Sequence, residues 1–318
     1  MIDFNIDMNP NHIDMKTYNP DQEAMKHMEF TKQFPDTKPL GGFPEGMDIE
    51  VGEIVELQIP DTGYASSSCK IYYPKGEGPF PVLFCIHGGA FFGGWQFLDE
   101  PFCRQVCHDC GIAVVSPKYV LAPEFKFPRP LIEMYRELIY LKKEQKQLKL
   151  DMSRLAVAGG SAGGHHALNI CQLAYERKEL EGLDIKYGIF AYPVIDGATP
   201  GKNREDALTD TEAMHGEMID MFINTYHPEG LDREDSYFSP INMDLEALPP
   251  FLMFSGRTDA LNQEFRRFAA RVMEEGKNEA VFKIYPDTPH GFLESDAAVE
   301  AARDIKAITC DLLKRALQ

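Results

Sequence analysis

The segment at residues 159–163 places a serine between small residues. It reads Gly-Gly-Ser-Ala-Gly and matches the pattern G-x-S-x-G, with Ser161 at its centre. An apolar run precedes the segment and a helical pattern follows it, so we expect a tight strand-to-helix turn in which flanking Cβ atoms would clash. A serine hydroxyl exposed on such a turn is a candidate nucleophile. The alternative is a glycine-rich turn whose serine has no chemical role.

A second glycine-rich segment, His87–Ala90, follows a predicted strand. Its two glycines let the backbone approach a bound molecule and direct N–H groups toward it. We expect the amides of Gly88 and Gly89, together with the amide of Ala162, to form an oxyanion hole that stabilises the charged oxygen of a tetrahedral intermediate. His87 is expected to brace this loop by hydrogen bonding and not to act as a base.

A nucleophilic serine needs a base to take its proton and a carboxylate to orient that base. Among nine histidines, His290 alone lies in a loop just after the last predicted strand, where it can reach the carboxyl edge of a sheet. Asp259 follows the preceding strand, so the chain order would be Ser161, Asp259, His290. Asp196 also follows a predicted strand and is an alternative acid. A second alternative is a purely structural Asp259 that caps the next helix.

Clustered cysteines and histidines raise the question of a metal. Cys103, Cys107 and Cys110 have the spacing C-x₃-C-x₂-C, which resembles the iron–sulfur motif of radical S-adenosylmethionine enzymes. The same spacing falls on one face of a predicted helix, where buried small side chains explain it better than a cluster or a zinc site does. The adjacent His165 and His166 point in different directions on a helix. We therefore expect no metal and no cofactor.

The elements that must position these residues follow from alternating apolar runs and helical patterns. Short apolar runs predict eight strands, at residues 53–59, 69–73, 82–86, 112–116, 155–158, 187–191, 251–254 and 280–285. Helical patterns lie between them, at residues 101–110, 131–148, 162–177, 263–275 and 296–317. This alternation predicts βαβ units and a three-layer α/β/α domain. The first two strands have a short connection, which favours an antiparallel pair.

A long gap in this alternation lies between the strands at 187–191 and 251–254. Its length far exceeds a usual loop of ~4–6 residues, and we expect a cap inserted at about residues 197–247. Apolar residues recur there at helical spacing: Met214, Met218, Met221, Phe222 and Tyr226. The alternative is a surface helix that docks this stripe on the main domain.

The first fifty residues differ in composition from the rest and are expected to form a separate N-terminal cap segment. They are rich in Met, Asn, Asp and Pro, and Asn19 is a good N-cap for one helix that would carry Met25 and Met28 inward. The expected division is a cap segment at residues 1–50 and a catalytic domain at residues 51–318 that holds the insert.

Net charge and cysteine count exclude several classes of protein. Lys plus Arg number 32 and Asp plus Glu number 50, so the net charge is −18. Such a surface repels nucleic-acid phosphates and anionic lipid headgroups. No apolar run reaches the ~18 residues of a membrane helix. The seven cysteines suit free thiols in a reducing compartment, and the acidic residues 1–10 do not resemble a signal peptide. We expect a cytoplasmic protein that binds neither nucleic acid nor membrane, and a homodimer stays open.

Five segments together resemble the hormone-sensitive-lipase-like family of α/β-hydrolase esterases. They are His87–Ala90, Tyr119–Glu124, the turn at residues 159–164, Asp259, and His290–Phe292, and they match the family in order and spacing over roughly residues 50–318. The resemblance implies an α/β-hydrolase fold, with a mostly parallel eight-stranded sheet flanked by helices and a helical cap. Three positions depart from the family pattern: Ala90 replaces a third glycine, Gly160 an acidic residue and Val120 an arginine with its ion pair.

The resemblance implies a serine carboxylesterase for small, short-chain acyl esters. Ser161 would be the nucleophile, His290 the base and Asp259 the orienting acid. The substrate is expected to contact side chains that follow the oxyanion loop and side chains of the inserted helix: Phe91, Phe92, Trp95, Met214, Met218 and Phe222. A serine peptidase or amidase of the same fold and a non-catalytic ligand-binding protein are the alternatives. A binding protein does not require a base aligned with a serine, so the complete set of three residues argues against it.

Overall fold

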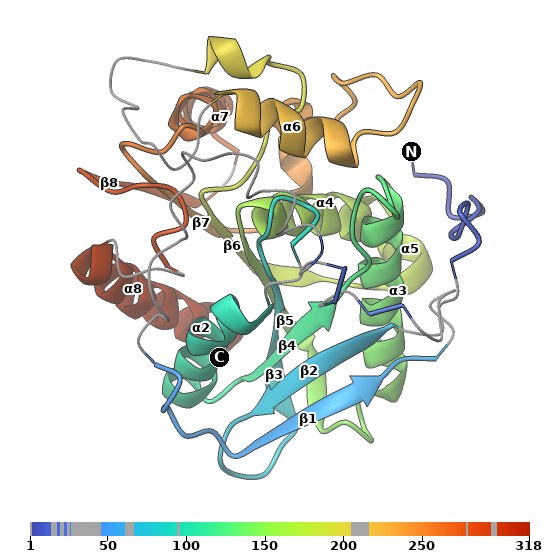
Figure 1. Ribbon diagram of the computed structural model, residues 1–318. Helices are drawn as coiled ribbons and strands as arrows, with labels where there is room; N and C mark the ends of the chain where they lie inside the picture. Colours follow the sequence, from blue (N-terminus) through green and yellow to red (C-terminus); the bar gives the residue numbers. More distant parts are fainter. Residues whose placement is uncertain are drawn as a thin grey trace.

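An eight-stranded sheet runs through the part of the chain that the structure describes (Figure 1). The computed structural model describes residues 2–13, 18–19, 22–23, 26, 46–60, 67–93, 96–204, 216–277, 279–293 and 298–318. The strand order is β1-β2-β4-β3-β5-β6-β7-β8. The strands are β1 (Glu53–Gln58), β2 (Ser68–Tyr73), β3 (Phe80–Ile86), β4 (Ala113–Lys118), β5 (Leu150–Gly160), β6 (Ile185–Ala191), β7 (Phe251–Gly256) and β8 (Ala280–Tyr285).

Strand pairing follows the predicted, mostly parallel pattern. β1 and β2 pair antiparallel, as expected, and β2 also pairs antiparallel with β4. The remaining neighbours are parallel. Each predicted strand is present, with bounds that differ by a few residues. The exception is β5, which starts at Leu150 because Leu150 and Asp151 pair with β3 ahead of a register shift between Pro81 and Val82.

Helices cover both faces of the sheet and complete the predicted three layers (Figure 1). α2 and α8 pack together on one face, where Val106 and Leu313 are fully buried. α3, α4 and α7 bury Leu138, Leu168 and Phe268 in the core of the other face. The helices are α2 (Gln96–Cys110), α3 (Arg129–Glu144), α4 (Ala162–Glu176), α5 (Lys178–Glu181), α6 (Gly216–Tyr226), α7 (Asn262–Glu275) and α8 (Val299–Leu317). Because helices cover both faces of the sheet, a binding site is expected in the loops at the carboxyl ends of the parallel strands.

The connection between β6 and β7 contains the predicted helix, but this helix is rotated about its axis so that a different face is buried. It comprises η1 (Gly201–Asn203), α6, η2 (Pro240–Asn242) and η3 (Leu245–Ala247). α6 buries Ile219, Ile223 and Tyr226, spaced i, i+4 and i+7, whereas Met218 is only half-buried. The buried face therefore consists of two isoleucines and the expected Tyr226, and not of the expected methionines. Met214 lies outside the described residues.

A buried ion pair ties the start of this insert to α7. The guanidinium of Arg204 contacts the carboxylate of Glu264, and both side chains are almost completely buried. Oε1 of Glu264 also accepts a hydrogen bond from the backbone N–H of Ile195 at 2.8 Å. Because a buried charge is tolerated only when it is paired and hydrogen-bonded, this contact holds the path of the chain as it leaves β6.

The described part of the N-terminal segment packs against α3 and the loop before it. The Phe4 ring meets the Tyr135 ring edge-on at 5.8 Å, and the guanidinium of Arg136 donates to the Phe4 carbonyl at 2.9 Å. The Tyr18 hydroxyl accepts the backbone N–H of Leu121 at 3.0 Å. The backbone N–H of Glu23 bonds to the carbonyl of Asn19, as at a helix start, but Met25 and Met28 lie outside the described residues. The cap segment at residues 1–50 stays a prediction.

Two glutamates of α3 are buried beside the position where the family has an arginine. Glu133 accepts the backbone N–H of Val120 at 2.8 Å, and Glu137 accepts the hydroxyl of Ser67 at 2.6 Å. One carboxylate oxygen of each has no hydrogen-bond partner. Burial raises the pKa of Glu133 to about 8 and moves the pKa of Glu137 upward as well. Val120 offers these buried acids no positive charge, so burial favours their protonated forms.

All seven cysteines are free thiols. Among the helices that the structure describes, none is long and apolar enough to cross a membrane.

Candidate active site

Ser161 lies on a sharp turn between β5 and α4. Its backbone has φ 54° and ψ −120°, a conformation that costs free energy for any residue with a side chain. A Cβ at Gly159 would lie 2.2 Å from the carbonyl oxygen of Gly163, and a Cβ at Gly163 would lie 2.1 Å from the carbonyl oxygen of Ile86. The turn therefore requires glycine at both positions, and it leaves Ser161 partly exposed at the edge of the sheet.

The ring of His290 bridges Ser161 and Asp259. Its Nε2 lies 2.8 Å from Oγ of Ser161, and its Nδ1 lies 2.9 Å from Oδ2 of Asp259. These residues follow β8, β5 and β7, so the carboxyl ends of three parallel strands bring them together. With a proton assigned to Nδ1, the ring donates to the carboxylate and its Nε2 accepts from the serine hydroxyl. Such an arrangement can take the proton of Ser161 while Oγ attacks an electrophilic carbon.

The carboxylate of Asp259 is completely buried and held on both oxygens. Oδ1 accepts the backbone N–H of Leu261 at 2.8 Å, and Oδ2 accepts the hydroxyl of Ser255 at 3.3 Å in addition to the His290 ring. Leu261 directly precedes α7, so Asp259 orders the start of this helix and orients the histidine at once. A buried negative charge in this position would stabilise a positively charged imidazole.

The alternative acid, Asp196, has other partners. It accepts the backbone N–H and the hydroxyl of Thr199 at 2.8 and 2.7 Å, and it forms an ion pair with Arg267 at 2.5 Å. Burial opposes its ionisation, but the bonds from Thr199 and the charges of Arg204 and Arg267 hold the pKa of Asp196 below its usual value. Asp196 thus anchors the start of the insert, and the carboxylate that contacts His290 belongs to Asp259.

The backbone of the predicted oxyanion loop lies against the turn of Ser161. A Cβ at Gly88 would be 3.1 Å from the carbonyl oxygen of Gly160 and 3.6 Å from Cβ of Ser161. Gly89 has φ 122°, and a Cβ there would be 2.2 Å from the carbonyl oxygen of Gly93. Ala162 is the first residue of α4, so its amide is among those that a helix leaves without an internal partner. The three amides therefore come from backbones that meet beside Ser161.

His87 braces this loop, as expected. Its ring stacks on the ring of Tyr119 with centroids 4.3 Å apart, and its Nδ1 lies 2.7 Å from the carbonyl oxygen of Gly88. The Tyr119 hydroxyl donates to the carbonyl of His87 at 2.9 Å. Both side chains are buried, so the two stacked rings support the loop from the protein interior.

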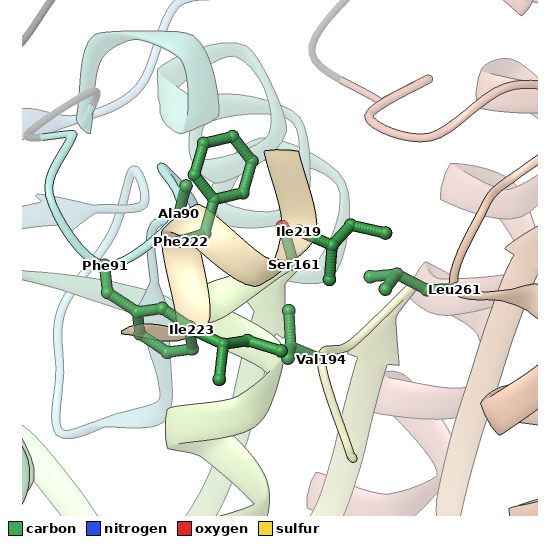
Figure 2. A pocket seen from close by; sticks show the side chains of 8 residues that line it. All are labelled: Ala90, Phe91, Ser161, Val194, Ile219, Phe222, Ile223 and Leu261. Atoms are coloured by element: carbon green, nitrogen blue, oxygen red, sulfur yellow. The ribbon is translucent and has the colours of Figure 1, made fainter. Parts of the chain in front are cut away.

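A narrow apolar pocket opens beside Ser161 (Figure 2). Its empty space of about 270 Å³ includes the open mouth. α6 contributes three neighbouring side chains that cover the pocket (Figure 2). The lining consists of Ser161 and seven apolar residues, Ala90, Phe91, Val194, Ile219, Phe222, Ile223 and Leu261. The pocket suits a small apolar group attached to the carbon that Ser161 attacks.

Of the six predicted substrate-binding residues, only some line the pocket. Phe91 and Phe222 line the pocket, and Phe92 packs its ring on Phe222 at 5.3 Å. Met218 does not line this pocket. Trp95 and Met214 lie outside the described residues.

Four residues that line the pocket were not predicted to bind substrate, because isolated apolar residues carry no chemical signature. Helical spacing from Phe222 could have found Ile219, three residues earlier. Val194 and Leu261 come from loops whose path the sequence pattern does not show. The four are Val194, Ile219, Ile223 and Leu261.

The cysteine spacing on α2 does not gather thiols. Cys103 lies against Cys85, whereas Cys107 donates to the carbonyl of Tyr72 and Cys110 to the carbonyl of Cys310. His165 and His166 are buried, and burial lowers the pKa of His165 to about 4. Within the described residues, no three histidine, cysteine or acidic side chains lie close enough to hold a metal ion.

Comparison with known proteins places this chain in a family. A family model described as alpha/beta hydrolase fold matches residues 83–294, about two-thirds of the chain. The chain belongs to this family. The resemblance to hormone-sensitive-lipase-like esterases is thereby confirmed.

Named relatives of this α/β-hydrolase are distant in sequence. It is 28% identical to carboxylesterase NlhH of Mycobacterium tuberculosis over 83% of each chain. It is also 28% identical to the putative alpha/beta hydrolase R526 of Acanthamoeba polyphaga mimivirus, over 65% of this chain and 60% of that protein. Among solved structures, a hyperthermophilic esterase from Pyrobaculum calidifontis superposes with a TM-score of 0.77 at 25% identity, over 96% of this chain and 92% of that one.

Proposed function

We propose that this α/β-hydrolase is a carboxylic ester hydrolase that works through a covalent acyl-serine. The observation that carries the proposal is the continuous hydrogen-bonded line from Ser161 through His290 to the buried Asp259. Relatives named esterase or carboxylesterase support the choice of esters. A fold of this kind hosts several chemistries, so the site supports the proposal more strongly than the fold does.

In the first half of the reaction, Oγ of Ser161 attacks the ester carbonyl carbon while Nε2 of His290 takes the serine proton. Asp259 keeps the ring in the required tautomer and stabilises the imidazolium that forms. The amides of Gly88, Gly89 and Ala162 stabilise the negative charge on the former carbonyl oxygen. When this oxyanion collapses, the bond to the alcohol breaks and His290 returns the proton to the leaving oxygen.

In the second half, water replaces the alcohol. His290 takes a proton from the water as its oxygen attacks the acyl carbon, and a second oxyanion forms in the same hole. Its collapse breaks the bond to Oγ of Ser161, releases a carboxylic acid and returns the proton to the serine. All proton transfers use Nε2 of His290, which already lies 2.8 Å from Oγ.

The substrates are small esters with short acyl chains. Support comes from the limited pocket beside Ser161, which is closed over by Ile219, Phe222 and Ile223 of α6. Each methylene that enters the pocket gains up to ~0.8 kcal/mol from burial, and this gain stops once the pocket is full. A cytoplasmic location fits the free thiols, since a reducing compartment keeps cysteines unpaired.

A fluorophosphonate probe and a panel of esters test the proposal. The wild-type protein should bind one probe per chain and hydrolyse esters, and Ser161→Ala should lose both properties while keeping the wild-type circular dichroism spectrum. Ester turnover by a folded Ser161→Ala protein would disprove the mechanism. A peptide substrate in the same panel separates esterase from peptidase activity. A chelator should leave the rate unchanged.

A further inference from the structure

Two aromatic rings join the cap helix α6 to the oxyanion loop. The ring of Tyr226, at the end of α6, stacks on the ring of Phe91 with centroids 4.2 Å apart and an interplanar angle of 2°. Phe91 follows Ala90 directly at the end of the oxyanion loop. Tyr226 is 1% exposed and Phe91 is 2% exposed, so the contact is fully shielded from water.

The Phe91 ring is also held from the side of the nucleophile. The rings of His165 and His166, in the first turns of α4, meet it edge-on at 5.2 and 5.6 Å. Burial keeps both histidines neutral by lowering the pKa of each. The same two histidine rings also meet the Tyr226 ring edge-on, at 5.9 and 5.6 Å, so the stacked pair of Phe91 and Tyr226 packs as a unit on the helix that begins after Ser161.

The oxyanion loop needs such support because its backbone is strained. Gly89, Ala90 and Phe91 have φ angles of 122°, 53° and 69°. For Ala90 and Phe91 this left-handed conformation is unfavourable and persists only when surrounding contacts enforce it. Three backbone hydrogen bonds support the loop. The N–H groups of Phe92 and Gly93 donate to the Gly89 carbonyl at 3.1 and 2.6 Å, and the N–H of Ala122 donates to the Phe91 carbonyl at 3.0 Å. The Tyr226 ring adds the contact from the cap.

The same helix also lines the pocket. Ile219, Phe222 and Ile223 cover it within the two turns before Tyr226, and Phe91 lines the same pocket (Figure 2). The Tyr226 carbonyl accepts the backbone N–H of Phe127 at 3.1 Å, which fixes the end of α6. A group that fills the pocket presses on α6 and so bears on the position of the Tyr226 ring.

We propose that Tyr226 is a positioning residue for the oxyanion hole, through its stack on Phe91. Filling of the acyl pocket then favours the loop conformation that stabilises the oxyanion. This inference rests on the proposed esterase function. It implies that acyl groups which fill the pocket raise kcat more than they lower KM, since the contact is used in the transition state.

Four variants separate positioning from packing. Tyr226→Met breaks the stack but fills much of the volume with a flexible side chain, and Tyr226→Leu is a second stack-breaking variant should the first fail to fold. Tyr226→Phe keeps the ring and removes a hydroxyl that has no hydrogen-bond partner. Ile305→Ala, fully buried on α8 across the sheet, controls for general loss of stability.

The kinetic test compares kcat and KM over an acyl series. Tyr226→Met should lower kcat by roughly 10- to 100-fold for acyl groups that fill the pocket, with KM changed less than about threefold, and it should flatten the dependence of kcat on acyl length. Tyr226→Phe should keep kcat within about twofold of the wild-type value. Loss confined to KM, or equal loss in Ile305→Ala at matched stability, would overturn the proposal.

Hydrogen–deuterium exchange gives a readout that does not need turnover. The amides of residues 88–92 should exchange at least about tenfold faster in Tyr226→Met than in Tyr226→Phe or Ile305→Ala. Equal exchange in the three variants would overturn the coupling. A wild-type protein that hydrolyses no ester would refute the esterase proposal, and the exchange comparison would still decide whether Tyr226 holds the loop.

Discussion

Nδ1 of His290 lies 2.9 Å from Oδ2 of Asp259, and the side chain of Asp259 is completely buried. Because this carboxylate has no access to water, a water molecule cannot take its place in orienting the imidazole. The second oxygen of Asp259 is already bonded to the backbone N–H of Leu261, so the carboxylate has little freedom to rotate. This contact makes the acid the most specific part of the site to test.

Asp259→Asn should lower kcat by about 10⁴-fold, because an amide at this position leaves the imidazole in the wrong tautomer. Asp196→Asn is the matched control, since it removes the same charge from a buried aspartate that contacts Thr199 and Arg267. It should reduce stability more than turnover. Steady-state kinetics and thermal unfolding of both variants check this, and a larger loss of kcat in Asp196→Asn would show that the acid was assigned wrongly.

Acyl length should show a maximum in kcat/KM at about two to six carbons, with a steep fall by about ten carbons. Phe222→Ala removes a side chain that closes the pocket. We expect the maximum to move to longer chains, with a gain of roughly tenfold for an acyl group two methylenes longer, as burial of ~0.8 kcal/mol per methylene implies.

Met218→Ala is the control for this shift, because Met218 lies on the same helix and does not line the pocket. Its acyl profile should match that of the wild type. Turnover that keeps rising with chain length, in particular at a lipid interface, would instead indicate an open groove, and the prediction of a capped pocket would be wrong.

Gly89→Ala should disable the oxyanion loop. The new Cβ would lie 2.2 Å from the carbonyl oxygen of Gly93 at a φ of 122°, so the backbone of the loop must move. We expect kcat to fall by roughly 10²- to 10³-fold, comparable with the loss of one oxyanion donor. Gly76→Ala has nearly the same φ, 121°, with nothing within 4 Å of the new Cβ. It should cost a little stability and leave kcat intact, and equal kinetic loss in both variants would refute the assignment.

Stability should fall as the pH rises, because Glu133 is protonated in the folded protein. Burial raises its pKa from 4.5 to about 8. The folded state therefore binds more protons than the unfolded state between these values, and the stabilisation is complete below about pH 4.5 and is lost as the pH rises through about 8. The melting temperature should decline over this window, in which the upward shift of Glu137 acts in the same direction.

Glu133→Gln removes this titration and should flatten the decline, whereas Glu179→Gln, on the exposed surface of α5, should not. Differential scanning calorimetry from pH 5 to 9 measures the slopes. Parallel slopes in wild type and Glu133→Gln would mean that the glutamate is ionised throughout, and the pKa assignment would be wrong.

Much of the fold was predictable from local pattern. Apolar runs and helical periodicity depend on neighbours a few residues away, so the eight strands and the long helices between them were found. The four-residue α5 was not predicted, and β5 begins earlier than expected. The turn at Ser161 was predictable for the same reason, because only small residues fit around its backbone. Gly88 and Gly89 were predictable for the same reason, because a side chain at either position would meet nearby backbone atoms.

The choice of acid was not local. Asp196 and Asp259 both follow parallel strands, and only the folded loops decide which carboxylate reaches Nδ1 of His290. The rotation of α6 was likewise undetermined, since isoleucine and methionine stripes one residue apart are equally apolar. The surface against which α6 packs selects between them.

The sequence by itself determined the turn at Ser161, the glycine loop at residues 87–90, the order of strands and helices, and the position of His290 after the last strand, because short-range sterics and periodicity specify each one. The tertiary structure alone decided the partner of His290, the side chains of the pocket, and the stack of Tyr226 on Phe91. Such contacts join residues far apart in the chain. Their formation depends on how whole elements pack, and apolar side chains of similar size leave several packings open until the complete core is assembled.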